Sequence, residues 1–127
     1  MNIINAVSGT GITQTADGSG LIKVQSNGVT TNALAWVNFV GSSASVNSSY
    51  NVSSVTRQSA GNYTITFANS QSSASYVVTG SADGNSLGVT TYTSFNALST
   101  SNFTMKTANS ANTATDYVAA FAVVFGN

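Results

Sequence analysis

The stretch that decides the fold begins Ala35-Trp36-Val37-Asn38-Phe39 and, beyond a polar segment and Ser49-Tyr50-Asn51-Val52, ends in Tyr63-Thr64-Ile65-Thr66-Phe67. It holds the only tryptophan and the only arginine of the chain, among β-branched and aromatic residues that favour strands. In its last part, apolar side chains alternate with threonines. This is the period of a strand with one face on a core and the other on solvent. The stretch therefore predicts a β protein.

Segments of the same character recur on both sides of this stretch, and none has helical periodicity. Turns rich in glycine, serine and asparagine separate them. The expected strands are residues 21–25, 33–40, 50–57, 63–67, 76–82, 87–92, 102–107 and 117–125. This spacing predicts an all-β fold, an antiparallel, jelly-roll-like β-sandwich of about eight strands. Residues 21–127 are expected to form it as a single domain.

Two irregularities are predicted inside the deciding stretch. In residues 50–57 the apolar side chains change face, which indicates a β-bulge near Ser53 and Ser54 or a strand with both faces partly covered. Residues 59–62 predict a hairpin in which Gly61 takes a positive φ angle.

The last strand, residues 117–125, is almost wholly apolar. Such a run is typical of a central strand covered on both faces, or of a strand at a subunit interface. Its alanines would also permit a short helix, but its valine and aromatic content favours a strand.

Residues 1–20 combine glycine, serine and threonine with four aliphatic residues, Ile3, Ile4, Val7 and Ile12. A disordered tail is one interpretation. Because a free tail needs fewer apolar residues, we favour an extended N-terminal arm that lies on a partner.

Composition excludes several classes of function. Charged residues make up 5% of the chain and the net charge is zero, so little repulsion keeps copies of the protein apart. Nucleic acid is not an expected partner, because its phosphates require a basic surface. No apolar run approaches the length of a membrane span and no signal peptide is recognisable. Cysteine is absent, which excludes disulfides and thiolate metal sites.

Catalytic residues are also not expected. Without histidine, the chain has no Ser-His-Asp triad and lacks the commonest zinc ligand. Asp17 and Asp83 lie beside glycine in turns, where aspartate is an ordinary turn residue. Asp116 is expected to bond a backbone group or to pair with Arg57 or Lys106. We therefore expect no enzyme and no catalytic, cofactor-binding or metal-binding residues.

The remaining conspicuous side chains have two interpretations each. Trp36 lies in the middle of an apolar strand and is expected in the core or at an interface, rather than as a platform for a sugar ring. Arg57 and Lys106 belong either to a surface binding site or to strands that charge protects from edge pairing.

Three segments carry a family resemblance: residues 35–39, residues 49–57 (Ser-Tyr-Asn-Val-Ser-Ser-Val-Thr-Arg) and residues 61–67 (Gly-Asn-Tyr-Thr-Ile-Thr-Phe). They resemble a β module of phage tail-fibre and virion surface proteins. Residues 74–78 and 118–125 fit its later strands, so the resemblance covers about residues 33–127. It implies a compact, trimeric, non-enzymatic domain on the outside of a virion. Fibre proteins carry a long shaft before this module, whereas Met1 stands only a short way upstream here.

From this resemblance we expect a homotrimeric bacteriophage virion protein, a decoration or cement protein that binds the major capsid protein and stabilises the head. One alternative is the receptor-binding tip of a short tail fibre or other tail appendage, which would bind a host glycan or surface protein through its loops. A third is a carbohydrate-binding module. The expected interface residues are Ile3, Ile4, Val7, Ile12, Trp36, Phe121 and Phe125.

Overall fold

The computed structural model describes residues 24–27, 29–84 and 90–126. These residues form strands, turns and loops. Within this part of the chain there is no helix with the length and apolar character needed to cross a membrane. The expected arm over residues 1–20, including Ile3, Ile4, Val7 and Ile12, lies outside the described residues.

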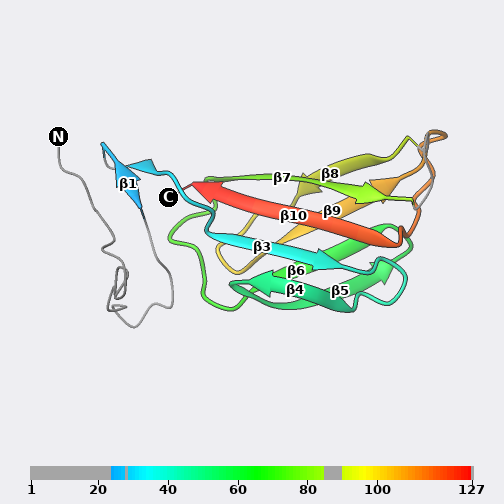
Figure 1. The fold of residues 1–127 in the computed structure, drawn as a ribbon, viewed down its shortest axis with the longest axis horizontal. Helices are drawn as coiled ribbons and strands as arrows, with labels where there is room; N and C mark the ends of the chain where they lie inside the picture. The colour runs from blue at the N-terminus through cyan, green and yellow to red at the C-terminus, as the bar shows by residue number, and fades with distance from the viewer. Residues whose placement is uncertain (1–23, 28, 85–89, 127) are drawn as a thin grey trace, which may run out of the picture.

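The described chain contains short strands throughout (Figure 1). They are β1 (Gln25–Ser26), β2 (Val29–Thr30), β3 (Ala35–Phe39), β4 (Val46–Tyr50), β5 (Val52–Ser59), β6 (Asn62–Phe67), β7 (Tyr76–Asp83), β8 (Tyr92–Asn96), β9 (Asn102–Ala108) and β10 (Ala119–Gly126). β1 and β2 pair only with each other, whereas β3 to β10 form two four-stranded antiparallel sheets. The predicted all-β sandwich is therefore confirmed.

The front sheet of Figure 1 has the strand order β4-β3-β10-β7, and the back sheet has the order β5-β6-β9-β8. Three hairpins, β3–β4, β5–β6 and β8–β9, stay within one sheet. In a jelly roll most consecutive strands belong to opposite sheets. The likeness to a jelly roll is therefore limited to the pair of packed four-stranded sheets.

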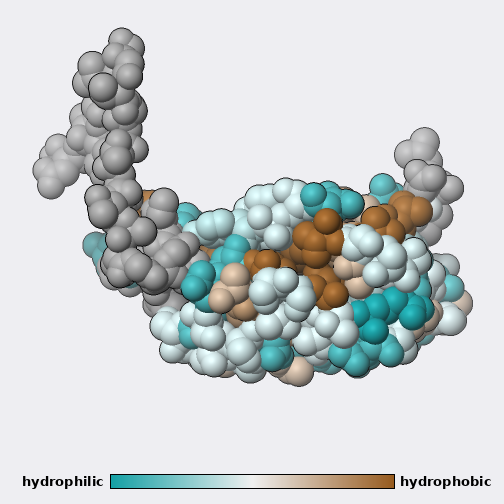
Figure 2. All heavy atoms as spheres, turned by 90° about the horizontal axis from the view of Figure 1, so that it is seen from below, coloured by the Kyte–Doolittle hydropathy of each residue, from teal (hydrophilic) through white to brown (hydrophobic). Residues whose placement is uncertain are grey.

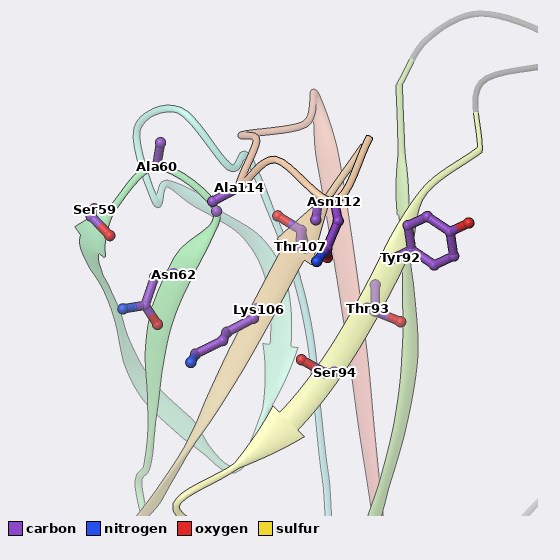
Figure 3. Close-up of a pocket in the computed structure, with 12 residues that line it drawn as sticks. Ser59, Ala60, Asn62, Tyr92, Thr93, Ser94, Lys106, Thr107, Asn112 and Ala114 are labelled. Carbon is purple, nitrogen blue, oxygen red and sulfur yellow. The ribbon is translucent and has the colours of Figure 1, made fainter. Parts of the chain in front are cut away.

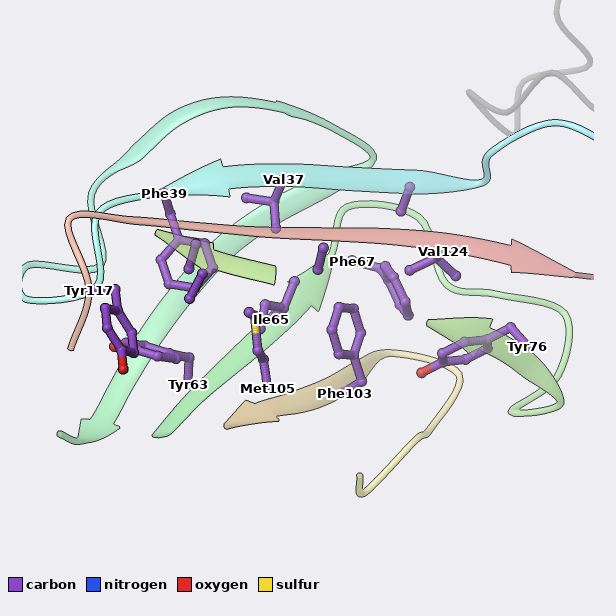
Figure 4. Packing of buried hydrophobic residues seen from close by; sticks show 14 residues of the cluster. Val37, Phe39, Tyr63, Ile65, Phe67, Tyr76, Phe103, Met105, Tyr117 and Val124 are labelled. Atoms are coloured by element: carbon purple, nitrogen blue, oxygen red, sulfur yellow. The ribbon is translucent and has the colours of Figure 1, made fainter. Parts of the chain in front are cut away.

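The core lies between the two sheets and is rich in aromatic rings (Figure 4). On β6 every second side chain, Tyr63, Ile65 and Phe67, is buried, as the alternation in the sequence predicts. The ring of Phe67 lies 5.6 Å from that of Tyr76 and 5.7 Å from that of Phe103. Rings from several strands therefore join the two sheets along the length of the sandwich.

The last strand is a strand and not a helix, and it is central as predicted. β10 pairs with β3 on one side and with β7 on the other. Ala120, Ala122 and Val124 face the core and are almost completely buried. Small alanines at these positions leave room for the aromatic rings of the opposite sheet.

The expectation of one strand over residues 50–57 is wrong in its bounds. β4 ends at Tyr50 and β5 begins at Val52, and between them the chain passes from the front sheet to the back sheet. Asn51 turns this corner with φ 52°. Its side-chain amide donates hydrogen bonds to the carbonyl oxygens of Leu34 and Asn69. These contacts, distant in the sequence, stabilise a corner that the apolar pattern hides.

Two smaller predictions in this region are confirmed. The register of β5 against β6 shifts between Val52 and Ser54, where a bulge is expected. Gly61 has φ 62° in the β5–β6 hairpin. A Cβ atom at this position would lie 2.3 Å from the carbonyl oxygen of Thr107, so the site accepts only glycine without rearrangement.

One strand was misplaced by the sequence pattern. The structure has β8 at Tyr92–Asn96, where the sequence predicts mainly a connection, and half of the expected strand over residues 87–92, namely residues 87–89, lies outside the described residues. β8 is an edge strand on which Tyr92, Ser94 and Asn96 are exposed. An edge strand with so few apolar residues has little periodicity for a sequence pattern to detect.

Candidate functional site

The outer side of the front sheet gathers large apolar side chains from all four strands. Trp36 on β3 lies between Tyr50 on β4 and Val123 on β10 in one cross-strand row. Phe125 pairs with Val77, one row further along. We call this surface the apolar face; it consists of Trp36, Tyr50, Val77, Phe121, Val123 and Phe125.

Several of these side chains meet solvent in the protomer. Trp36 is 37% exposed, Phe125 39% and Val77 66%. Trp36 is therefore outside the core, and its neighbours Val37 and Phe39 take the core positions of β3. Solvent-exposed aromatic residues gathered on one face are typical of an interaction surface.

Three of the residues expected at an interface thus come together. Phe121 and Phe125 lie two positions on either side of Val123, the residue that pairs with Trp36. Tyr50, Val77 and Val123 also belong to the apolar face but were not expected there. Their place depends on strand register, which the apolar pattern of a single strand does not contain.

The polar side chains beside the aromatic residues carry no charge, whereas Asp83, which pairs with Ala119 at the end of the same side of the sheet, is charged. Asn38 and Ser81 lie on either side of Phe121, and Thr79 pairs with Val123. Covering this surface would therefore bury small uncharged polar groups, whose removal from water is far less unfavourable than that of ions.

The edge formed by β4 and β5 is a second place where hydrophobic side chains reach the surface (Figure 2). Val46 is 43% exposed there, and Val52 and Val55 are half-buried against the core. Both edge strands pair irregularly with their inner neighbours. The register of β4 against β3 shifts between Asn38 and Phe39, and that of β5 against β6 shifts between Val52 and Ser54. Bulges of this kind hinder strand addition at an edge, so this edge is less suited to pairing with another strand than a regular one.

The outer side of the back sheet has the opposite character. Thr56, Thr64, Thr104 and Asn96 form one row across its four strands. The neighbouring positions carry serine, asparagine, glutamine and Lys106. The sandwich therefore has one apolar and one hydroxyl-rich outer side.

The charged pair of the described chain lies at one end of the sandwich, where the chain enters β10. The Asp116 carboxylate accepts hydrogen bonds from Arg57 Nη2 at 2.7 Å, from the Tyr63 hydroxyl at 2.6 Å and from the Gly61 amide at 2.9 Å. Asp116 therefore both pairs with Arg57 and bonds a backbone group, two of the alternatives that the sequence left open; Lys106 is not its partner.

These contacts shift the ionisation of the groups involved. The hydrogen bond from Arg57 and, after it, those from Tyr63 and Gly61 lower the pKa of Asp116 to about 2, against an opposing effect of burial. Burial and the bond to Asp116 raise the pKa of Tyr63 to about 12. Both groups therefore keep one protonation state around neutral pH, which suits a structural role and not proton transfer.

No group of three or more metal-ligating side chains that could hold an ion is gathered within residues 24–27, 29–84 and 90–126. Comparison with known proteins finds no matching family, no similar curated protein and no similar solved structure.

Proposed function

We propose that this protein is a non-enzymatic structural protein of a bacteriophage virion, a self-associating decoration protein that stabilises the capsid. The observation that carries the proposal is the apolar face of the front sheet, with Trp36 and Phe125 exposed in the protomer. The resemblance of residues 33–127 to phage surface modules supports the same function.

Copies of this chain are the occupant that the apolar face fits best. A zero net charge gives copies little reason to repel one another, and the polar groups that pair with Phe121 and Val123 are uncharged, with Asp83 at the end of this side of the sheet. Aromatic residues are enriched at the centres of protein interfaces. Three copies around a three-fold axis would turn their apolar faces toward one another and leave the hydroxyl-rich sides in solvent.

Attachment to the capsid is assigned to a different part of the chain. Ile3, Ile4, Val7 and Ile12 supply apolar contacts for the major capsid protein in this proposal. The trimer interface and the capsid contact would then be formed by different residues, so that a substitution could disrupt one of them and leave the other intact.

Light scattering on the purified protein tests self-association. We expect three times the protomer mass of 12.9 kDa at micromolar concentration. Trp36→Ser and Phe125→Ser should give monomers, whereas Tyr92→Ser, which removes an exposed aromatic ring from the other sheet, should leave the trimer intact. A stable monomer of the unchanged protein at this concentration would contradict the proposal.

Particles provide the second test. Virions without this protein should lose infectivity faster on heating or osmotic shock, and a cryo-EM map should place it at regular capsid positions. Absence of the protein from isolated heads would contradict a decoration role.

The second candidate is a receptor-binding tip of a tail appendage, and the hydroxyl-rich outer side of the back sheet favours it. Hydroxyl and amide groups on an open sheet face suit contact with a glycan or a polar protein surface. In that case the purified protein should bind host cells and compete with virions for adsorption.

A further inference from the structure

A hollow of about 480 Å³ lies at one end of the back sheet, beside the β5–β6 hairpin (Figure 3). Its volume is within the usual range of small-molecule sites. Ser59, Asn62, Lys106 and Ser94 form a row across all four strands beneath it, set by the pairs Ser59–Asn62, Asn62–Lys106 and Ser94–Lys106. The hollow thus lies over all four strands, at the end of β5 where its register against β6 shifts between Arg57 and Ser59.

Small residues leave this space open. Ala108 pairs with Tyr92 on β8 and bridges to Ala114 in the loop that follows β9. Neither alanine fills the volume between the Tyr92 ring and the β5–β6 hairpin. Asn112, held in this loop with φ 57°, lines the same hollow. Tyr92 is 52% exposed beside the space.

The polar side chains of the hollow are available to a ligand. Those of Ser59, Asn62, Ser94, Lys106 and Asn112 make no hydrogen bond to another described residue. Their donors and acceptors can therefore bond a ligand without first breaking contacts within the described part of the protein.

Lys106 is the charged residue of the hollow. Within the described chain its ammonium group makes no ion pair, and Asp116 pairs with Arg57 instead. In Figure 3 the Lys106 side chain lies between Asn62 and Ser94, with amide and hydroxyl groups on either side. One cation surrounded by neutral donors and acceptors fits a ligand that has one negative charge and several hydroxyl groups.

We propose that this hollow binds an acidic saccharide, a pyranose ring that carries one carboxylate or sulfate group. The acid group bonds the Lys106 ammonium, the ring packs against the face of Tyr92 above Ala108, and the hydroxyl groups bond the Asn62 and Asn112 amides and Ser94. This activity goes beyond the proposed structural role. It uses the sheet opposite the apolar face, so an assembled protein could bind saccharide and its neighbours at once.

Other ligand classes fit less well. A nucleotide or polyphosphate would place several negative charges on one lysine, without a helix N-terminus or a second cation to share them. A metal ion would find amides and hydroxyls but no carboxylate in the hollow. An apolar ligand would leave five polar side chains without partners.

Glucuronic acid and glucose provide a matched pair of probes, because they differ only at carbon 6, where one has a carboxylate and the other a hydroxymethyl group. In a titration followed by amide chemical shifts, we expect glucuronic acid to bind at least about tenfold more tightly than glucose. The shifts should centre on Asn62, Ser94 and Lys106. Glucose 6-sulfate distinguishes the acid group: tighter binding than glucuronic acid assigns the site to sulfate, and weaker binding assigns it to carboxylate.

Substitutions distinguish the contribution of the Lys106 charge to binding from that of the Tyr92 ring. Lys106→Gln should lower the affinity for glucuronic acid at least about tenfold and leave that for glucose unchanged. Lys106→Arg should retain binding, and Tyr92→Ala should weaken both sugars. Equal affinity for all three sugars, binding insensitive to Lys106→Gln, shifts centred elsewhere, or no binding at millimolar concentration would overturn the proposal.

The same variants keep this proposal distinct from self-association. Lys106→Gln should leave the trimer mass unchanged, whereas Trp36→Ser should give a monomer that still binds glucuronic acid. Failure of saccharide binding in an intact trimer would refute this site alone, and binding by a protein that is always monomeric would refute self-association alone.

Discussion

The Asp116 carboxylate accepts hydrogen bonds from both Nε and Nη2 of Arg57, although 59 positions separate the two residues in the sequence. Arg57 belongs to β5 in the back sheet, and Asp116 lies shortly before β10 of the front sheet. The Tyr63 hydroxyl, which reaches the same carboxylate, comes from the interior. This group of residues therefore joins the two sheets at one end of the sandwich.

Asp116→Asn should lower the free energy of unfolding by about 2 kcal/mol, because hydrogen bonds to a charged acceptor are stronger than those to a neutral one. Denaturant unfolding measures the change. Lys106→Gln is the control, since it removes an exposed charge that has no ion-pair partner, and it should change stability little. Equal losses from the two substitutions would show that the Asp116 contacts do not stabilise the fold.

The pH dependence of stability follows from the same residues. Asp116 has its pKa lowered from 3.8 to about 2, so its contribution is present above pH 3.8 and is lost as the pH falls toward 2. Tyr63 has its pKa raised from 10.0 to about 12, so its contribution is present below pH 10 and is lost as the pH rises toward 12. Because the chain contains no histidine, we expect a nearly constant melting temperature between these limits.

Melting curves recorded across this pH range test that expectation. Tyr63→Phe should remove part of the alkaline decrease, since the ionising hydroxyl is gone, and Asp116→Asn should remove part of the acid decrease. Carboxyl groups ordinarily titrate below about pH 5 and tyrosines above about pH 9. A melting temperature that changes strongly between these two pH values would mean that other groups control stability.

Gly61→Ala should destabilise the protein by more than about 2 kcal/mol. The backbone has φ 62°, and the added Cβ would lie 2.3 Å from the Thr107 oxygen and 2.6 Å from the Thr115 nitrogen, both of them backbone atoms. Ala60→Gly is the matched control, because Ala60 is the exposed neighbour in the same hairpin. A Gly61→Ala protein as stable as this control would show that the hairpin can rearrange freely.

Local features of the fold could be predicted from the sequence because they depend on a few adjacent residues. The alternation of Tyr63, Ile65 and Phe67 determines which face of β6 is buried. Glycine in a short hairpin predicts the positive φ of Gly61. The bulge near Ser53 follows from a change of face within β5.

The corner at Asn51 could not be predicted in this way. Tyr50, Asn51 and Val52 continue the character of a strand, and the chain turns there because Asn51 bonds Leu34 and Asn69. Such contacts exist only once the sheets have packed. The same reason explains why β4 was missed, since its exposed side chains give almost no apolar pattern.

The apolar face and the hollow around Lys106 also differ in how far the sequence predicts them. Trp36, Phe121 and Phe125 are conspicuous in the sequence, so an interface role could be proposed for each of them. Their convergence on one face depends on the register of β3 against β10. For Lys106 a surface binding site is one of the two interpretations that the sequence allows. The other residues of the hollow could not be predicted, because they come from β5, β6, β8, β9 and the loop after β9 and none is unusual alone.

Trp36 is the only tryptophan of the chain, so its fluorescence reports directly on the apolar face. It is 37% exposed in the protomer, and association through this face would transfer the indole ring out of water. We expect its emission to move to shorter wavelength as the protein concentration rises from nanomolar to micromolar. The midpoint of this change should agree with the concentration at which light scattering detects assembly.

Phe125→Ser should abolish the wavelength change, because Phe125 lies on the same face as Trp36. The substitution leaves the indole ring of Trp36 in place as the reporter. Tyr92→Ser, on the back sheet, should preserve the change. If light scattering detects assembly while the emission stays constant, copies associate through another surface, and the β4–β5 edge with Val46 becomes the first alternative. If light scattering gives the protomer mass at every concentration and the emission stays constant, the protein does not self-associate and the apolar face must serve a different partner.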